Sequence, residues 1–361
     1  MGLPDIVIEF TKKAVSTIAV GTGGIVGMIV FDAEDYVGAH VYRSADQITS
    51  GLTAANKAHI ERAFLGQPRA VHVYVVKAEN NADYTNALKY FGNKQINYIC
   101  GDPDITTTLA TALASWVIAK RTAGKIKPVA VIPRQSAGSD NEGVVNVDYV
   151  GTGNIKEGDT AITKAQFCAR VAGILAGLSL TQSATFYKLD EITEIPEEDD
   201  DTVYDTAIDA GKLVPYNTGS GIVIARAVNS LTTVSQAKTE DLKKIKIVAI
   251  QDRITQDIMD TINNSYIGKY SNSYDNKCLL ITAIRGYLTQ LENEGYIERD
   301  RSTIDINVER QRQYLESTGV DTTDMDEAEI RHYNTGSHVF LSGTVSILDA
   351  IEDVEIIINK E

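Results

Sequence analysis

Residues 21–32 read GTGGIVGMIVFD, a glycine-rich turn that leads into a nearly continuous apolar run from Ile25 to Phe31. An apolar run without polar alternation is typical of a strand that is buried on both faces. Such strands occur in parallel sheets that are covered by helices on both sides. The stretch therefore predicts an α/β fold built in layers.

The segments that follow alternate between helix and strand patterns. Helical spacing is found over residues 53–66, 82–91 and 109–121, and short apolar strands are predicted over 70–76, 96–100, 128–132 and 144–150. A fourth helix is predicted to begin at Thr163, with Gln166 in the position of a capping box. Strands that alternate with helices predict a largely parallel sheet.

Residues 190–209 form an acidic tract with ten carboxylates and no basic residue. Like charges at this density resist compaction, so the tract predicts a solvated loop. The functional alternative is a surface that faces a basic partner.

The pattern changes at Thr239 to long amphipathic helices. The first is predicted as one continuous rod from Thr239 to about residue 266, and two more follow over 276–293 and 308–317. Two strands close the sequence, Val339 to Leu348 and Val354 to Ile358.

Short apolar strands are thus expected near both ends of the sequence, because residues 5–10 also show the period-2 pattern of a strand with one apolar face. A terminal strand can pair with the sheet edge of a neighbouring chain through main-chain hydrogen bonds. Head-to-tail contacts that do not close generate helical filaments. This pattern favours a self-assembling subunit.

The 361 residues include 34 Lys and Arg against 49 Asp and Glu, a formal net charge of −15. This charge argues against a nucleic-acid module, which needs a basic field. No apolar run approaches the roughly 20 residues that span a bilayer, and no signal-peptide pattern is found, so a cytosolic origin without membrane insertion is expected. Three isolated cysteines, Cys100, Cys168 and Cys278, favour a reducing compartment.

The sequence contains no motif of catalysis, cofactor binding or metal binding. The glycines of residues 21–27 have a spacing like that of a dinucleotide fingerprint, but they lead into a strand instead of opening a helix. No Walker loop, HExxH, zinc-spaced Cys/His cluster or GxSxG elbow is found. We therefore expect no enzyme, no cofactor and no metal, with a cytosolic α/β nucleotide-binding enzyme as the alternative.

Several longer segments follow one another along nearly the whole chain: LPDIVIEFTKKAVSTI, NKAHIERAFLGQPRAVHVYVV, ARVAGILAGLSLTQSATFYKL, VERQRQYLESTGVD and NTGSHVFLSGTVSILDAIEDVEI. Together they closely resemble the contractile tail sheath protein of myophages, in its small type from Gram-positive prophages and R-type bacteriocins. The resemblance implies a subunit that polymerises helically around an inner tail tube, between baseplate and tail terminator proteins. It would contract to drive the tube through a target cell envelope. It would be assembled in the bacterial host cytoplasm and released as part of a tail particle.

The resemblance also implies a fold and a division of the chain. An N-terminal arm (1–20) would precede an α/β outer and middle region (21–238), subtilisin-like but without the protease's active residues. A helix-rich α+β sheath domain (239–348) would lie at the inner radius, facing the tube. A C-terminal arm (349–361) would follow it.

Neighbouring subunits of this family exchange their arms as added strands. By resemblance, the exchanged residues are Ile6, Val7, Ile8 and Phe10 in the N-terminal arm and Val354, Ile356, Ile357 and Ile358 in the C-terminal arm. The receiving strand would contain Val339, Leu341, Val345 and Ile347.

Four basic residues, Lys243, Lys244, Lys246 and Arg253, are candidates for a stripe that faces an acidic tube. The alternative is a solvated helix face of mixed charge. The interleaved carboxylates of Asp252, Asp257 and Asp260 favour this second interpretation.

Overall fold

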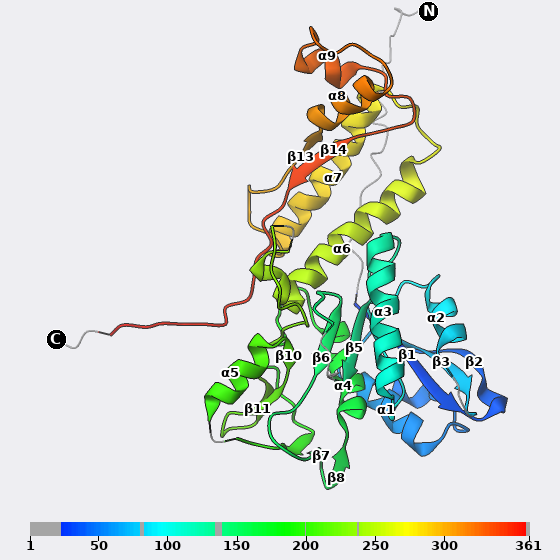
Figure 1. Ribbon diagram of the computed structural model, residues 1–361, viewed down its shortest axis with the longest axis vertical. Coiled ribbons are helices and arrows are strands. Elements are labelled where there is room, and N and C mark those ends of the chain that lie inside the picture. Colours follow the sequence, from blue (N-terminus) through cyan, green and yellow to red (C-terminus); the bar gives the residue numbers. More distant parts are fainter. Residues whose placement is uncertain (1–22, 80–82, 134–138, 199, 237, 359–361) are drawn as a thin grey trace, which may run out of the picture. The chain divides into compact units, whose positions relative to one another are not determined.

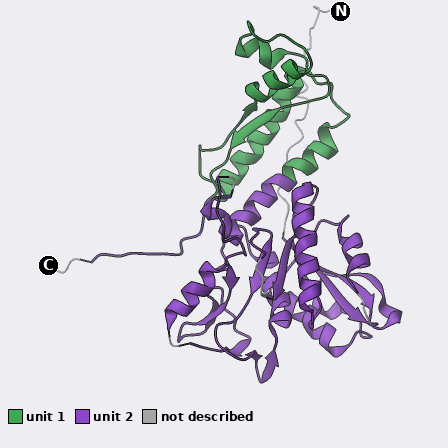
Figure 2. Cartoon of the chain, viewed as in Figure 1, with its two compact units in different colours: residues 1–21, 257–347 green, residues 22–256, 348–361 purple. Residues whose placement is uncertain are grey.

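The computed structural model describes residues 23–79, 83–133, 139–198, 200–236 and 238–358 (Figure 1). They belong to two compact units (Figure 2): unit 2 holds the chain up to Gln256 together with the residues from Leu348 onward, and unit 1 holds Asp257–Ile347. The predicted N-terminal arm lies outside the described residues. The predicted domain boundaries at 238/239 and 348/349 stay predictions.

Unit 2 is built on a seven-stranded sheet with the strand order β10-β6-β5-β4-β1-β3-β2. Its strands are β1 (Ile25–Asp32), β2 (Gly38–Tyr42), β3 (Ala70–Lys77), β4 (Tyr98–Cys100), β5 (Val129–Pro133), β6 (Val144–Val147) and β10 (Lys212–Leu213). All neighbouring pairs are parallel except β2 with β3, at one edge. The prediction of a largely parallel sheet is confirmed.

Helices cover both faces of this sheet. The helices α1 (Ala54–Phe64) and α4 (Lys164–Gly177) enclose one apolar core, and α2 (Thr85–Phe91) and α3 (Thr107–Ala123) enclose the other. Strand β1 supplies Val26, Met28 and Val30 to the first core and Ile25 and Ile29 to the second. Its unbroken apolar sequence is explained by this burial on both faces.

Local signals fix the ends of several helices. The side chain of Thr163 accepts a hydrogen bond from the backbone N–H of Gln166, whose own side chain accepts one from the N–H of Thr163, so the predicted capping box opens α4. Helix α3 ends at Gly124, whose φ of 77° lies in the left-handed region that glycine adopts without strain. Two short 3-10 turns, η1 (Glu34–Tyr36) and η2 (Ala45–Gln47), flank β2.

The acidic tract is not the solvated loop that its charge predicts. It contains the strand β9 (Ile192–Glu194) and the helix α5 (Asp201–Asp209). Helix formation is favoured because Asp200 caps its N-terminus and because Tyr204 and Ala207 are buried on one side. Strand β9 joins β7 (Ile155–Glu157) and β8 (Thr160–Ile162) in a small sheet, and β11 (Pro215–Asn217) pairs with β12 (Ile222–Ile224).

The long helix predicted from Thr239 is interrupted. A 3-10 turn, η3 (Glu240–Lys243), is followed by Lys244 in extended conformation, and α6 begins afresh (Ile245–Thr261). It continues as the π-helical turn η4 (Ile262–Tyr266). The prediction of one rod is wrong at Lys244 because this residue forms a β-bridge with Val228, a contact that local helix periodicity does not reveal.

Unit 1 contains the helices α7 (Tyr274–Glu294), α8 (Val308–Ser317) and α9 (Glu327–His332) and an antiparallel pair of strands, β13 (Thr303–Ile306) and β14 (Leu341–Thr344). The predicted C-terminal strands are shorter than expected. The strand predicted from Val339 to Leu348 is regular only over β14, with an isolated bridge between Ile297 and Ile347. Residues 354–358 pair with no strand of the described part of the chain.

Candidate functional site: the C-terminal segment and its docking site

The C-terminal segment, residues 348–358, exposes apolar side chains that a folded chain normally buries. Ile351 is 89% exposed, Val354 is 70% exposed, and Ile356, Ile357 and Ile358 are 74, 79 and 86% exposed. Single exposed apolar residues are ordinary, but a cluster within eight residues marks an interaction surface. These side chains include all four residues predicted for exchange at this end.

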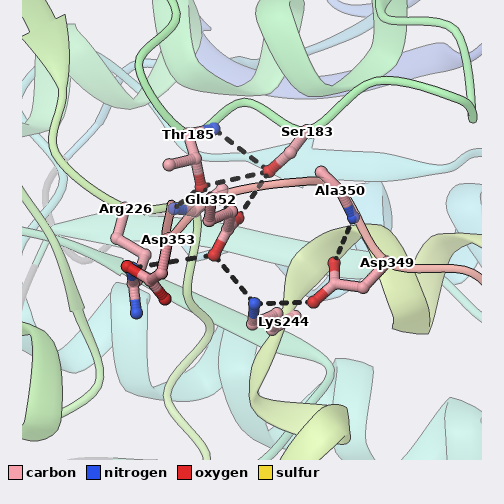
Figure 3. A network of polar contacts seen from close by, with 9 residues as sticks. Ser183, Thr185, Arg226, Lys244, Asp349, Ala350, Glu352 and Asp353 are labelled. Carbon is pink, nitrogen blue, oxygen red and sulfur yellow. Dashed lines mark hydrogen bonds and ion pairs between the residues drawn. The ribbon is translucent and has the colours of Figure 1, made fainter. Parts of the chain in front are cut away.

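Glu352 anchors the segment to unit 2, as Figure 3 shows. Its Oε1 accepts hydrogen bonds from the hydroxyls of Ser183, at 3.2 Å, and Thr185, at 2.7 Å. Its Oε2 lies 2.8 Å from Nζ of Lys244 and 3.6 Å from Nε of Arg226. The side chain is only 5% exposed, so these partners compensate for the loss of its hydration.

Two further carboxylates of the segment bind the same cations. Oδ2 of Asp349 lies 2.6 Å from Nζ of Lys244, and the other oxygen of Asp349 accepts a hydrogen bond from the N–H of Ala350. Oδ1 of Asp353 accepts a hydrogen bond from Arg226 at 2.5 Å. We call Ser183, Thr185, Arg226 and Lys244 the docking site.

Three separate segments form the docking site. The backbone at Phe186 and Tyr187 pairs with Ile224 of β12, and the hydroxyl of Thr185 accepts a hydrogen bond from the N–H of Ala227. The bridge between Val228 and Lys244 then brings the start of α6 beside the chain that follows Arg226. The break in the predicted long helix therefore places Lys244 in the docking site.

Charge stabilises this arrangement. Burial alone would lower the pKa of Lys244, but its bonds to Asp349 and Glu352 outweigh burial and raise the pKa above its ordinary value. Lys246, which is 8% exposed, also feels the charges of both carboxylates, although burial lowers its pKa overall. Together with Arg226, these lysines balance the three carboxylates of the C-terminal segment.

The other predicted site residues lie in different surroundings. Lys243 pairs with Glu240, and Arg253 is partly buried on α6, so the tube-facing stripe stays a prediction. In the predicted receiving strand, Val339 and Val345 are exposed, whereas Leu341 and Ile347 are half-buried. Among the described residues, β14 has β13 as its only neighbouring strand.

The predictions from sequence missed most of the docking site. They included Lys244, but for a different surface, and they used only the apolar residues of the C-terminal segment. The signal that could have found the site is the set of carboxylates Asp349, Glu352 and Asp353, which precede the apolar run in DAIEDVEIIIN.

A hollow in unit 2, separate from the docking site, lies at the carboxyl ends of β1, β3 and β4, where nucleotides bind in many α/β proteins. It has a volume of about 750 Å³, and the charged side chains that line it are all carboxylates: Glu79, Asp83, Asp102 and Asp104. Such a lining repels phosphate.

Asp32, at the end of β1, already fills the position of an anion at the N-terminus of α1. Its carboxylate accepts hydrogen bonds from the N–H of Thr53, at 2.9 Å, and from the side chain of Asn56, at 2.8 Å. Burial raises the pKa of Asp32, but these bonds outweigh burial and bring it below the ordinary value. The site where a nucleotide phosphate would bind is therefore occupied by the protein's own carboxylate.

The described residues contain neither a cluster of metal-binding side chains nor a membrane-spanning helix. No three side chains of His, Cys, Asp or Glu in that part of the chain lie close enough to hold a metal ion. No helix within the same ranges combines the length and apolar character that crossing a bilayer requires.

Comparisons with known proteins point to one family. The family model described as "Phage tail sheath protein central domain" matches residues 77–230, and "Phage tail sheath C-terminal domain" matches residues 237–356. The "Tail sheath protein" of Clostridium phage phiCD119 is 33% identical over 364 residues, which cover 98% of each chain.

Two solved structures share the fold. The sheath tail protein of Desulfitobacterium hafniense has a TM-score of 0.70 at 17% identity and covers 84% of this chain and 94% of its own. The helical sheath of the anti-feeding prophage, in its contracted state, has a TM-score of 0.72 at 14% identity over all of both chains. These identities establish likeness of fold alone.

Proposed function

The chain belongs to the phage tail sheath protein family, and from this premise we propose that it polymerises by exchanging strands between neighbouring subunits. In this proposal, Val354, Ile356, Ile357 and Ile358 leave their own subunit and add a strand to the sheet of a neighbour. The exposure of these side chains, 70 to 86%, is the observation that carries the proposal. Burying them in a neighbour removes a cost that the isolated chain cannot avoid.

The sheet formed by β13 and β14 is the proposed receiver. A pair of strands is marginal by itself and gains stability from an additional strand. The exposed Val339 and Val345 lie just before and just after β14, so an added strand would find apolar contacts there. The N-terminal residues Ile6, Val7, Ile8 and Phe10 are proposed to join the same exchange from another subunit.

The partners follow from the assembly. The solved relatives come from a helical sheath and from a baseplate complex. By analogy, we propose contacts of this chain with further copies of itself, with a baseplate and tail terminator, and with an inner tube, which Lys243 and Arg253 are candidates to face. Contraction would drive the tube through a target envelope. The subunit would be assembled in the host cytoplasm and released within the tail particle.

The role proposed here is structural and not enzymatic. The alternative, a nucleotide-binding enzyme, has no support from the family matches. The acidic hollow at Asp102 and the carboxylate of Asp32 at the N-terminus of α1 argue physically against a bound phosphate.

The test substitutes the exchanged residues without touching the docking site. The variant Ile356→Asp/Ile358→Asp places charges on the proposed strand, and Val37→Asp, at a residue 47% exposed in unit 2, is the matched control. With each protein co-expressed with an inner tube protein, we expect tubes from the unsubstituted chain and the control, and folded subunits that fail to assemble from the double variant, in electron microscopy and sedimentation. Tubes of normal yield from the double variant would refute strand exchange at this end.

A further inference from the structure

The C-terminal segment has an unusual distribution of polar and apolar side chains. Its carboxylate Glu352 is 5% exposed at the side chain, whereas the neighbouring Ile351 is 89% exposed. Burying a carboxylate while leaving an isoleucine in water is unfavourable unless the carboxylate has strong partners. The segment is therefore attached to unit 2 by its charges, whereas Ile351 and the apolar side chains from Val354 onward remain exposed.

The attachment stops abruptly along the sequence. Asp349, Glu352 and Asp353 all bind the docking site, and Asp353 is the last residue with such a contact in the described part of the segment. From Val354 onward the side chains are exposed. The segment thus consists of a bound root, residues 349–353, and a projecting tip, residues 354–358.

We infer that the three root carboxylates and the docking site form a clasp that keeps the root on its own subunit while the tip is exchanged. The inference rests on the proposed strand exchange and assigns positioning roles to Glu352, Lys244 and Arg226. The clasp fixes the point at which the exchanged strand leaves its subunit. Force along the strand is then transmitted to unit 2 at Lys244 and Arg226.

The clasp limits how far the tip can extend from its own subunit. If the clasp opens, the free part of the chain starts at Leu348 and gains six residues. At roughly 3.3 to 3.6 Å per extended residue, this adds about 20 Å of reach. A closed clasp restricts the tip to receivers near the docking site, so it contributes to the regularity of the assembly.

Carbodiimide crosslinking tests the clasp directly, since this reagent joins amines only to carboxylates in contact. We expect a Lys244–Glu352 crosslink in the full-length subunit before assembly. Tubes made from an equal mixture of ¹⁴N- and ¹⁵N-labelled chains should then give crosslinked peptides of a single isotope only. Mixed-isotope peptides would show that the root binds a neighbour, and a missing crosslink would show that the clasp does not form. Either result overturns the inference.

A pair of variants separates positioning from folding. Glu352→Gln removes the central charge, and Glu355→Gln removes an exposed carboxylate of the same segment outside the clasp. For Glu352→Gln we expect thermolysin to cut before Ile351 on the order of tenfold faster, because loss of a charged hydrogen bond raises the population of open clasp. Unfolding of unit 2, followed by the fluorescence of Trp116, should not change in either variant.

Equal cleavage rates in the two variants would overturn the inference. If strand exchange itself does not occur, the measurements differ in another way. The Lys244–Glu352 crosslink and the difference in cleavage rate are then still found in the subunit, but no tubes form.

Discussion

Gly173→Ala should destabilise the protein by about 2 kcal/mol or more, whereas the same substitution at Gly286 should stabilise it. Both glycines lie inside helices, Gly173 in α4 and Gly286 in α7. A Cβ at Gly173 would lie 2.0 Å from the carbonyl oxygen of Ala63 in α1, whereas a Cβ at Gly286 meets no heavy atom within 4 Å. The two variants therefore isolate the effect of the contact from the effect of helix propensity.

The magnitude follows from these distances. Carbon and oxygen atoms rarely approach within 3.0 Å, so α1 and α4 must separate by at least about 1 Å in a core packed as densely as a crystal. Overpacking costs about 1 to 3 kcal/mol and occasionally more. The obstacle here is the backbone of Ala63, which cannot rotate away, so a cost of about 3 kcal/mol or more is expected. Replacing glycine by alanine in a helix returns about 1 kcal/mol. The net loss is about 2 kcal/mol or more for Gly173→Ala, against a gain of about 1 kcal/mol for Gly286→Ala.

Urea unfolding followed by circular dichroism measures both changes. The fluorescence of Trp116, the single tryptophan of the chain, provides a second signal for Gly173→Ala because α3 belongs to unit 2. A Gly173→Ala variant as stable as the unsubstituted protein would refute the close contact of α1 with α4. Destabilisation by Gly286→Ala would refute the open surface assigned to α7.

Two further predictions concern titration and thiol reactivity. Burial lowers the pKa of His59 from 6.5 to about 4, so the unfolded chain binds a proton at this residue before the folded chain does as the pH falls. Urea titrations should therefore show that the free energy of unfolding decreases by about 3 kcal/mol between pH 6.5 and pH 4. The variant His59→Gln should lack this decrease. Cys100 and Cys168 are buried, and burial raises the pKa values of their thiols. Only the thiol of the partly exposed Cys278 should therefore react with Ellman's reagent in the native protein, whereas all three thiols should react in urea. Rapid labelling of three thiols in the native protein would contradict the burial of Cys100 and Cys168.

Much of the fold could be predicted from short patterns in the sequence. The unbroken apolar run of β1 indicates a strand buried on both faces, and Thr163 with Gln166 marks the start of α4. Helix α8 has the bounds that its periodicity predicts, Val308–Ser317. These features depend on residues close together in sequence, so propensity, capping and periodicity are sufficient to predict them.

The errors arise where distant residues decide the structure. Helix α5 forms within an acidic tract because Tyr204 and Ala207 find a buried surface that the tract itself does not reveal. The extended conformation of Lys244 depends on its bridge with Val228. The docking site joins side chains from three segments that lie far apart in sequence to the carboxylates of residues 349–353. No local sequence pattern therefore connects its parts.

Electron microscopy of the purified protein decides whether this chain polymerises as a sheath subunit. Samples should be examined at rising protein concentration, alone and after co-expression with an inner tail tube protein. Hollow, striated tubes with helical symmetry are expected in at least the co-expressed sample. A uniform population of single subunits under both conditions would contradict this expectation.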